Sequence, residues 1–576
     1  MKIIENKILE MKTNRKKLLV LTGFFLFTAT LMFAGSNEKG IDYYRAELYE
    51  AAKLFFLQQT DQSDLEKAEN YYYLGQIYNE LNKLDSASYY YKKAIEISPL
   101  YPFGYVGEGM IALKAGNKKA AEEFFKKAGN LAKKNPSVQT AIAEIYVDAG
   151  DNINALLALE KARKINTKYS GIYIVEGDMS MKQGKVGEAD GRYGQAISFN
   201  KNEKLAYLKS AQIYKNVNTK VALDYLGKLL AIDPEYIPAY ALLGDIYYKI
   251  VRNYNRALDA YEKFIVIPGV PLEQHESYAQ LLYFTKQYQK ALDEIKYVLS
   301  RDPDNLVMKR LEAYNSFRME NYELGFEQMN KFLEIMPVDR HIYLDYMTLF
   351  QLAVNLKNTE VALEALSKAI EKDPEKAKED NLYREKALVS YNARMFQEAI
   401  KYFEEYFEIE KTPQPSDFLN YAKANYFMAV PYIQPDKIAA ITAAEEREKH
   451  EAELKNYVKK GDNAYVELIK LLPNIHVGYM GRANIHELLD GYYSNATKKW
   501  ESIAKPFYEE ALTFLLNNNE DGARNKEIIE VYHYFNNCFI EVKDTASVIE
   551  YSKKILQLDP NNERARNNLK QLNVKF

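Results

Sequence analysis

Small residues recur at intervals of 34 positions along the first half of this chain. At that spacing Gly75 is followed by Gly109, Ala143, Gly177 and Ala211. Two more columns keep the same period: Ala87, Ala121, Ala155 and Ala189, and Ala94, Ala128, Ala162 and Ala196. Because three independent columns hold one period through several units, the segment is a tandem array in which each unit packs on its neighbours.

Residues 68–101 show what one unit contains. Gly75 and Ala87 mark the places where two antiparallel helices approach too closely for a larger side chain. Bulky residues such as Tyr91 fall three or four positions apart, on the buried stripe of each helix. Pro99 ends the second helix and positions the next one. The unit is therefore predicted to be a helix, a tight turn, a second helix and a proline break.

This unit resembles the tetratricopeptide repeat. The resemblance is carried by Tyr71, Leu74, Gly75, Tyr78, Ala87, Tyr91, Ala94 and Pro99. Tyr71 stands where the family usually has tryptophan, and such replacements account for many of the 49 tyrosines. The resemblance covers roughly residues 41–572 and is closest over 68–304. It implies an all-α, right-handed superhelical solenoid of antiparallel helix pairs, with about 13 to 15 units.

The pattern divides the chain into segments. We expect a capping half-repeat over 41–67, a regular array over 68–425, irregular units over 426–506, and a terminal unit with a polar capping helix over 507–576. The irregular stretch holds a charged helix near 443–454 and an insertion with the only tryptophan, Trp500. Insertions in repeat proteins collect on one face, so the segment near 431–462 is a candidate docking projection. The alternative is a pair of extended helices with solvated charged faces.

The first 35 residues have the composition of an export signal. A basic cluster at 12–17 precedes an apolar run over 18–34 that contains no charge. This order is typical of a cleaved signal peptide, and an uncleaved run would be an N-terminal membrane anchor and the only membrane contact. Either Met1 or Met11 can be the start. We expect an exported protein in the periplasm of a Gram-negative bacterium.

Composition and spacing argue against several other classes. Lys and Arg number 77 and Asp and Glu 80, so the net charge of -3 predicts no binding to nucleic acid. The single cysteine, Cys538, excludes a disulfide framework, and the closest histidines, His476 and His486, do not have the spacing of a zinc site. The array leaves no room for a catalytic domain. We therefore expect no catalytic residue, no metal, no cofactor and no enzymatic activity.

The family resemblance implies that the first helix of each pair lines a concave groove. The position after each small residue reads Gln76, Met110, Glu144, Asp178, Gln212 and Asp245. The position four residues earlier reads Tyr72, Val106, Thr140, Ile174 and Leu208. A polar, acidic track beside a largely apolar one is a candidate peptide groove, and the alternative is a set of solvated helix faces. Lysine and asparagine are missing from the first units of these columns, so a clamp for a chaperone's terminal carboxylate is not expected.

These features favour a non-enzymatic scaffold or adaptor of the bacterial cell envelope. Its expected partners are other envelope proteins or peptides, held in the concave groove. An alternative is a carbohydrate- or peptidoglycan-binding module that uses the tyrosines at 71–73 and 89–91 as stacking platforms.

Overall fold

The computed structural model describes residues 37–59 and 62–575, so the expected leader over 1–35 lies outside it. The described part is all α-helical and contains no β-strand. None of its helices is both long and apolar enough to cross a membrane. The chain divides into two compact units, residues 1–315 and 316–576, and α18 (Leu306–Arg318) includes the boundary.

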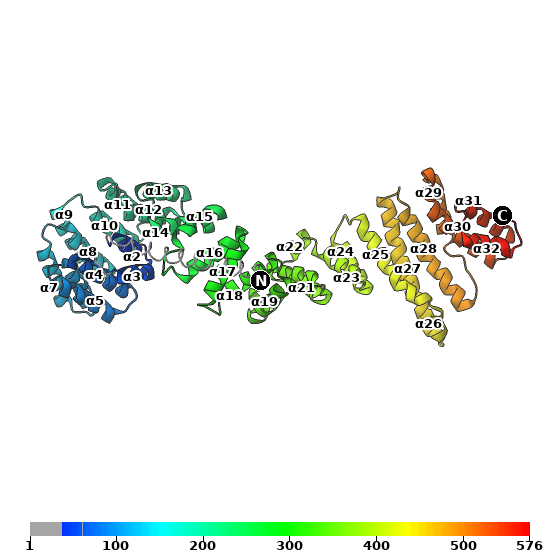
Figure 1. Ribbon diagram of the computed structural model, residues 1–576, viewed down its shortest axis with the longest axis horizontal. Helices are drawn as coiled ribbons and strands as arrows, with labels where there is room; N and C mark the ends of the chain where they lie inside the picture. Colours follow the sequence, from blue (N-terminus) through cyan, green and yellow to red (C-terminus); the bar gives the residue numbers. More distant parts are fainter. Residues whose placement is uncertain (1–36, 60–61, 576) are drawn as a thin grey trace, which may run out of the picture. The chain divides into compact units, whose positions relative to one another are not determined.

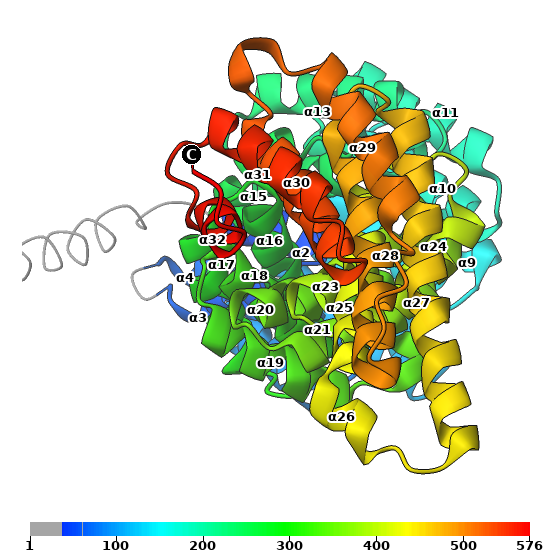
Figure 2. The ribbon, with the colours of Figure 1, turned by 90° about the vertical axis from the view of Figure 1, so that its right-hand side faces the viewer.

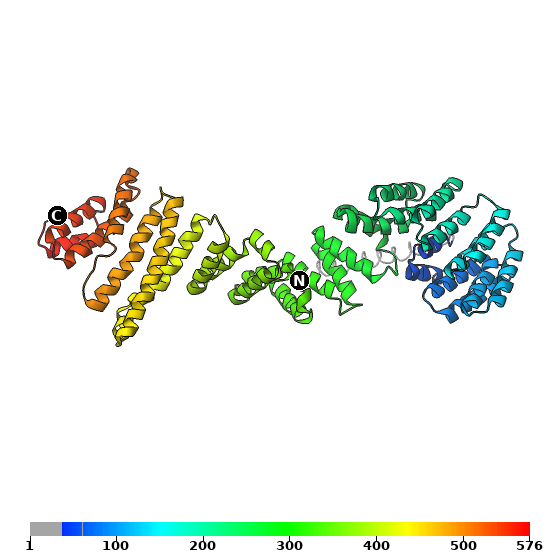
Figure 3. The same ribbon diagram turned by 180° about the vertical axis from the view of Figure 1, so that it is seen from behind.

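The first unit is a succession of antiparallel helix pairs that follow the sequence in order, from blue to green in Figure 1 and, seen from behind, in Figure 3. Its eight pairs are α2 (Glu38–Arg45) with α3 (Tyr49–Leu57), α4 (Asp64–Glu80) with α5 (Leu84–Ile97), α6 (Pro102–Lys114) with α7 (Lys118–Leu131), α8 (Pro136–Asp148) with α9 (Asn152–Ile165), α10 (Ser170–Lys182) with α11 (Val186–Phe199), α12 (Lys204–Tyr214) with α13 (Thr219–Ile232), α14 (Ile237–Asp245) with α15 (Tyr254–Phe264), and α16 (Leu272–Phe284) with α17 (Tyr288–Leu299). A π-helical segment, η1 (Ile246–Val251), continues α14.

The second unit contains five more pairs. They are α20 (Tyr343–Asn355) with α21 (Thr359–Lys372), α23 (Leu382–Asn392) with α24 (Phe396–Ile409), α25 (Pro415–Ala429) with α27 (Ala444–Leu471), α28 (His476–Thr497) with α29 (Lys505–Asn517), and α30 (Asn525–Glu541) with α31 (Thr545–Leu558). The remaining helices are α19 (Tyr322–Ile335), α22 (Pro374–Glu379), α26 (Pro435–Ala440), α32 (Glu563–Gln571) and three 3-10 turns, η2 (Val338–Arg340), η3 (Val430–Ile433) and η4 (Glu520–Gly522). The predicted all-α array of helix pairs is confirmed, and α32 covers the stretch where we expected a capping helix.

The small-residue columns are explained by aromatic rings from the paired helix. A Cβ atom at Gly75 would lie 2.3 Å from Cε1 of Tyr91, and one at Gly177 would lie 2.3 Å from Cε1 of Tyr193. Both rings are almost completely buried. The repeated small residue therefore leaves a slot in the first helix of a pair. An aromatic ring from the second helix fills this slot and holds the two helices together.

Filling one slot tests this packing. We expect Gly177→Ala to lower the free energy of unfolding by about 1–3 kcal/mol, because the new methyl group must displace Tyr193. Gly194→Ala is the matched control on the paired helix, since its Cβ would meet nothing within 4 Å. It should be neutral or add about 0.5–1 kcal/mol. Urea unfolding followed by circular dichroism measures both, and equal stabilities would contradict the slot.

The N-terminal pair folds back inside the curve of the first unit, where α2 and α3 are seen between α4 and α14 (Figure 1). One hydrophobic cluster joins it to α4 and to the later pairs, and consists of Tyr43, Leu48, Ala51, Ala52, Phe55, Phe56, Leu74 and Ile77, with Ile237 and Ile267 packed against it. The complete pair spans residues 38–57, so the stretch 41–67, where we expected a capping half-repeat, holds most of α2, all of α3 and the start of α4. The helices were missed because each is only two turns long, too short to show the repeat pattern.

An ion-pair cluster and a close backbone approach connect the pair to residues more than 160 positions away in sequence. The Lys204 ammonium group lies 2.6 Å from the Asp42 carboxylate and 3.1 Å from those of Glu38 and Asp233. Gly269, in the loop before α16, has a φ of 84°. A Cβ atom at this position would lie 2.9 Å from the backbone nitrogen of Ala51 on α3. A side chain at position 269 would therefore separate α3 from the loop before α16.

The charged insertion of the second unit is a continuous helix, as predicted, and it packs beside an equally extended partner. Figure 2 shows α27 in yellow next to α28 in orange, with α26 at one end. Tyr493 on α28 donates a hydrogen bond to Glu451 on α27, and the Asn495 amide donates to the Ile433 carbonyl oxygen at 2.9 Å. The inserted residues are thus braced against the array, while the side chains at 443–449 remain exposed.

Candidate functional site

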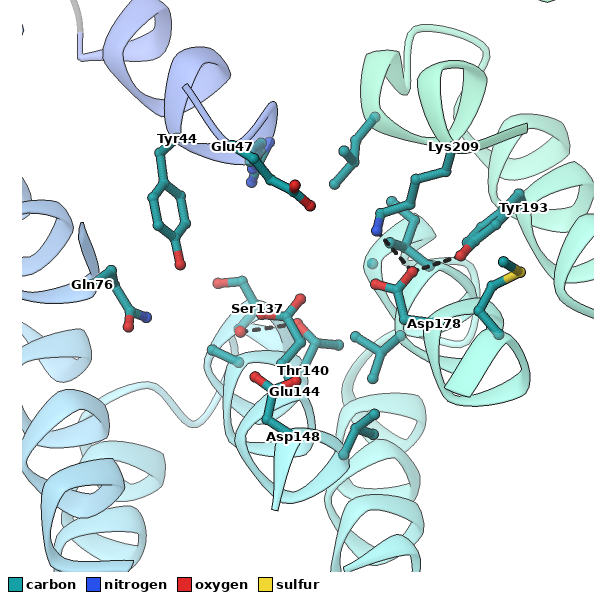
Figure 4. A pocket seen from close by; sticks show the side chains of 18 of the residues that line it. Tyr44, Glu47, Gln76, Ser137, Thr140, Glu144, Asp148, Asp178, Tyr193 and Lys209 are labelled. Atoms are coloured by element: carbon teal, nitrogen blue, oxygen red, sulfur yellow. Dashed lines mark hydrogen bonds and ion pairs between the residues drawn. The ribbon is translucent and has the colours of Figure 1, made fainter. Parts of the chain in front are cut away.

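A cavity of about 670 Å³ lies on the inner face of the first unit. Figure 4 shows its walls: the turn between α2 and α3 on one side, α8 beneath, and α10, α11 and α12 opposite. Helix α4 closes the remaining side with Tyr72, Tyr73, Gln76 and Glu80. Its volume lies within the range of small-molecule and side-chain binding pockets.

One wall of the cavity is aromatic. Tyr44 packs edge-on against Tyr73, with ring centroids 5.5 Å apart, and Tyr72 packs against Phe103 at 5.3 Å. Gln76 donates a hydrogen bond of 2.5 Å to the Tyr72 hydroxyl and accepts one of 2.8 Å from Tyr91. The slot under Gly75 therefore also sets the position of Gln76 at the cavity wall.

The opposite wall carries two ion pairs. The Lys209 ammonium group lies 2.8 Å from Asp178, which also accepts a hydrogen bond of 2.6 Å from Tyr193. Figure 4 marks both interactions with dashed lines. Lys182 pairs with Asp148 at 2.5 Å. These pairs neutralise two of the three cations that line the cavity.

Glu144 is the carboxylate whose protonation the cavity changes most. Burial raises the pKa of Glu144 to about 7, and the nearby charge of Asp178 adds to the effect. The side chain is open to the cavity, but protein surrounds the cavity, so little bulk water stabilises the charge. Burial, followed by the charge of Asp148, also raises the pKa of Glu80.

Arg45 is the remaining cation. Burial opposes its charge, but Tyr73, Glu203 and Glu144 together raise the pKa of the guanidinium group, so it stays protonated. Within residues 37–59 and 62–575, neither Arg45 nor Glu144 forms an ion pair. Both groups are therefore available to a bound molecule.

Seven of the predicted groove residues line this cavity: Tyr72, Gln76, Thr140, Glu144, Ile174, Asp178 and Gln212. Val106, Met110 and Leu208 do not line it, and their side chains are buried. Asp245 lies outside the cavity, where it accepts a hydrogen bond from Tyr261 and pairs with Lys249.

Sequence reasoning missed the part of the site that α2 and α3 supply. Tyr44, Arg45 and Glu47 enter the cavity only because the N-terminal pair folds back, and no local pattern signals that contact. Lys182 and Lys209 were missed because they fall outside the two columns. Lys182 lies four residues after Asp178 and Lys209 three residues before Gln212, and this closeness to the predicted residues was the available signal.

The tyrosine triplets serve packing. Tyr72 and Tyr91 are buried, Tyr73 stacks on Phe56, and Tyr90 stacks on Tyr78 with ring centroids 5.2 Å apart. Of the six rings only that of Tyr89 is largely exposed. The triplets therefore offer no continuous platform on which a sugar could stack.

Comparison with known proteins identifies the repeat. Residues 68–99 match the family model described as tetratricopeptide repeat. The matched unit, α4 with α5, is therefore a tetratricopeptide repeat. The ring-in-slot packing of the matched unit recurs at Gly177 and Tyr193, outside the matched residues.

Other similarities of this protein are distant. The protein CTR9 homolog of Arabidopsis thaliana is 26% identical over 117 residues, which are 20% of this chain and 11% of that protein. The chain thus spans about a tenth of the length of this curated relative. Two solved structures are similar: the C-terminal part of a TPR repeat-containing protein from Cytophaga hutchinsonii (19% identity, 51% of this chain and 99% of that chain, TM-score 0.32) and a tetratricopeptide repeat protein from Parabacteroides merdae (21% identity, 43% and 96%, TM-score 0.27).

The described part of the chain contains no group of three or more His, Cys, Asp and Glu side chains arranged to hold a metal ion. Cys538 is buried in the second unit, as expected from its position on an apolar helix face.

Proposed function

We propose that this protein is a non-enzymatic scaffold of the bacterial cell envelope that holds a segment of a partner protein in the cavity of its first unit. The observation that carries the proposal is the cavity itself, because polar groups from seven helices converge there on a space large enough for several side chains. Repeat arrays use such concave surfaces for binding.

The location in the envelope rests on the sequence of the first 35 residues. A basic cluster followed by an uncharged apolar run is the pattern that directs a chain to export. The partner is accordingly another exported protein or an exposed segment of a membrane protein.

Site-specific photo-crosslinking in the host cell tests the proposal. Gln212 is exposed and lines the cavity, so Gln212→p-benzoylphenylalanine should crosslink to one or a few discrete partners. Lys126→p-benzoylphenylalanine is the matched control, because Lys126 is exposed on α7, outside the cavity. Equal crosslinking patterns from the two positions would contradict binding in the cavity.

A further inference from the structure

We infer that the cavity of the first unit selects a lysine or arginine side chain of its partner segment, an inference that rests on the proposed function. The groups that carry it come from α2, α3, α4 and α8 and from the turn between α2 and α3.

The charge balance of the walls is the first argument. Six carboxylates and three cations line the cavity: Glu47, Glu80, Glu144, Asp148, Asp178 and Glu203 against Arg45, Lys182 and Lys209. Two of these cations are already paired with Asp148 and Asp178. Four carboxylates then remain against Arg45 alone, so a cation is the ligand that restores the balance.

Three of the six carboxylates lie at one end of the cavity. Glu80 and Asp148 are the last residues of α4 and α8, and Glu47 lies in the turn before α3. Burial, and then the charges of Glu80, Glu47 and Asp148, raise the pKa of the Tyr49 hydroxyl to about 12, which places all three close to this ring. The C-terminal ends of helices carry a partial negative charge, which further favours a cation at this end.

Arg45 defines the other end. The groups that act on its guanidinium are Tyr73, Glu203 and Glu144, and Glu203 immediately precedes α12. Helices α8, α10 and α12 present their first turns to this end through Ser137, Gly171 and Leu205. A bound segment would therefore direct its basic side chain toward Glu80 and a carbonyl oxygen toward Arg45.

The aromatic wall supplies the remaining recognition. The rings of Tyr44, Tyr49 and Tyr72 line the cavity. A lysine or arginine side chain could pack its methylene groups along these rings and place its charge over a ring face. A glutamate side chain in the same place would be repelled by Glu80 and Glu144 and would gain no such contact.

The inference predicts a pH dependence. Because the pKa of Glu144 is about 7, its carboxylate is mostly neutral at pH 6 and mostly charged at pH 8, whereas lysine stays protonated throughout. Affinity for a lysine peptide should therefore rise a few-fold between these values, and Glu144→Gln should abolish the rise. The charged and titratable groups around Glu144 are Asp178, Arg45, Lys209, Asp148, Tyr44, Tyr72, Tyr73 and Tyr169.

Direct binding of synthetic peptides to the full chain tests the inference. The probes are fluorescein-labelled peptides of alanine, glycine and serine that differ only at three central residues: lysine, glutamine or glutamate. The lysine peptide should bind about tenfold more tightly than the glutamine peptide, because it gains attraction from Glu80 and Glu144 in a partly desolvated site. The glutamate peptide should bind weakest.

Two double variants separate the cavity from the general surface charge. Glu80→Gln with Glu144→Gln should weaken binding of the lysine peptide about tenfold, and it should not impair folding because burial disfavours both charges. Glu122→Gln with Glu123→Gln removes two exposed charges from α7, outside the cavity, and should change the affinity less than about twofold. Circular dichroism checks the folding of each variant.

The outcome that overturns the inference is a lysine peptide that binds no better than the glutamine peptide, or that is affected equally by the two double variants. Crosslinking at Gln212 does not depend on the charge of the partner. A partner crosslinked there together with no preference for the lysine peptide would therefore refute this inference and leave the scaffold proposal standing.

Discussion

Lys204→Glu is expected to release the N-terminal helix pair from the inner face of the first unit. The Lys204 side chain is 17% exposed, and three carboxylates lie 2.6–3.1 Å from its ammonium group. A glutamate there would face Glu38, Asp42 and Asp233 with no cation between them. Removing one partner of a buried ion pair costs about 3–5 kcal/mol, and the exposure of Glu38 places this site near the lower figure.

Hydrogen exchange of the backbone amides measures the release. In the variant, the amides of α2 and α3 should lose protection, whereas those of α8 and α9 should keep it. Lys220→Glu is the control, because Lys220 is exposed on α13. Asp42→Lys in the Lys204→Glu background reverses the central ion pair and should restore part of the protection. Unchanged exchange over residues 38–57 would refute the role of Lys204.

Release of the pair should also abolish binding in the cavity. Tyr44, Arg45, Glu47 and Tyr49 would leave with α2 and α3, and the space between α4 and α12 would open to solvent. The lysine peptide should then bind the Lys204→Glu variant at least about tenfold more weakly than the native protein, since the remaining charges are screened by water. The N-terminal pair is thus part of the binding site as well as a cap on the array.

What the sequence predicts well is the packing inside one helix pair. The slot at Gly75 and the ring of Tyr91 lie 16 residues apart on adjoining helices, so a repeated spacing in the sequence becomes a repeated contact in space. The same logic predicted the polar residues Glu144 and Asp178 at the cavity wall. The packing follows from helical periodicity, and the groove positions follow from that periodicity together with the family resemblance.

Contacts between distant pairs could not be predicted in this way. Asp42 and Lys204 are separated by 162 residues, and no periodic pattern links them. The burial of Val106 and Met110 depends on how closely α4 and α8 approach α6, which is a property of the curvature of the array. Curvature arises from small rotations between successive pairs, and a single sequence does not specify these rotations.

The contact of the loop between α28 and α29 can be tested in the second unit, because the only tryptophan of the sequence, Trp500, lies in this loop. Asp490 on α28 is fully buried, and its carboxylate accepts hydrogen bonds from the backbone N–H groups of Ile503 and Ala504. It also accepts a hydrogen bond of 2.7 Å from the hydroxyl of Tyr534, whose ring contacts Trp500. One side chain therefore fixes both ends of the contact between this loop and α30.

Asp490→Ala should detach the loop. Each of the three donors would be left unsatisfied at a cost of about 1–3 kcal/mol, so we expect a loss of at least about 3 kcal/mol unless the loop moves into solvent. Movement of the loop into solvent relieves this cost. Trp500, which is partly buried in the native protein, would then become exposed. The tryptophan emission should shift to longer wavelength, and acrylamide should quench it more strongly.

Asp490→Asn should shift the tryptophan emission by an intermediate amount, because the amide keeps one acceptor oxygen. Asp436→Ala is the control, since Asp436 is exposed on α26 and should leave the emission unchanged. If the emission of the Asp490→Ala variant matched that of the native protein, the loop would be held by the packing of Trp500 against Tyr534 and not by the carboxylate. The anchoring role is therefore assigned to Asp490 if the emission shifts most in the alanine variant, less in the asparagine variant and not at all in the native protein.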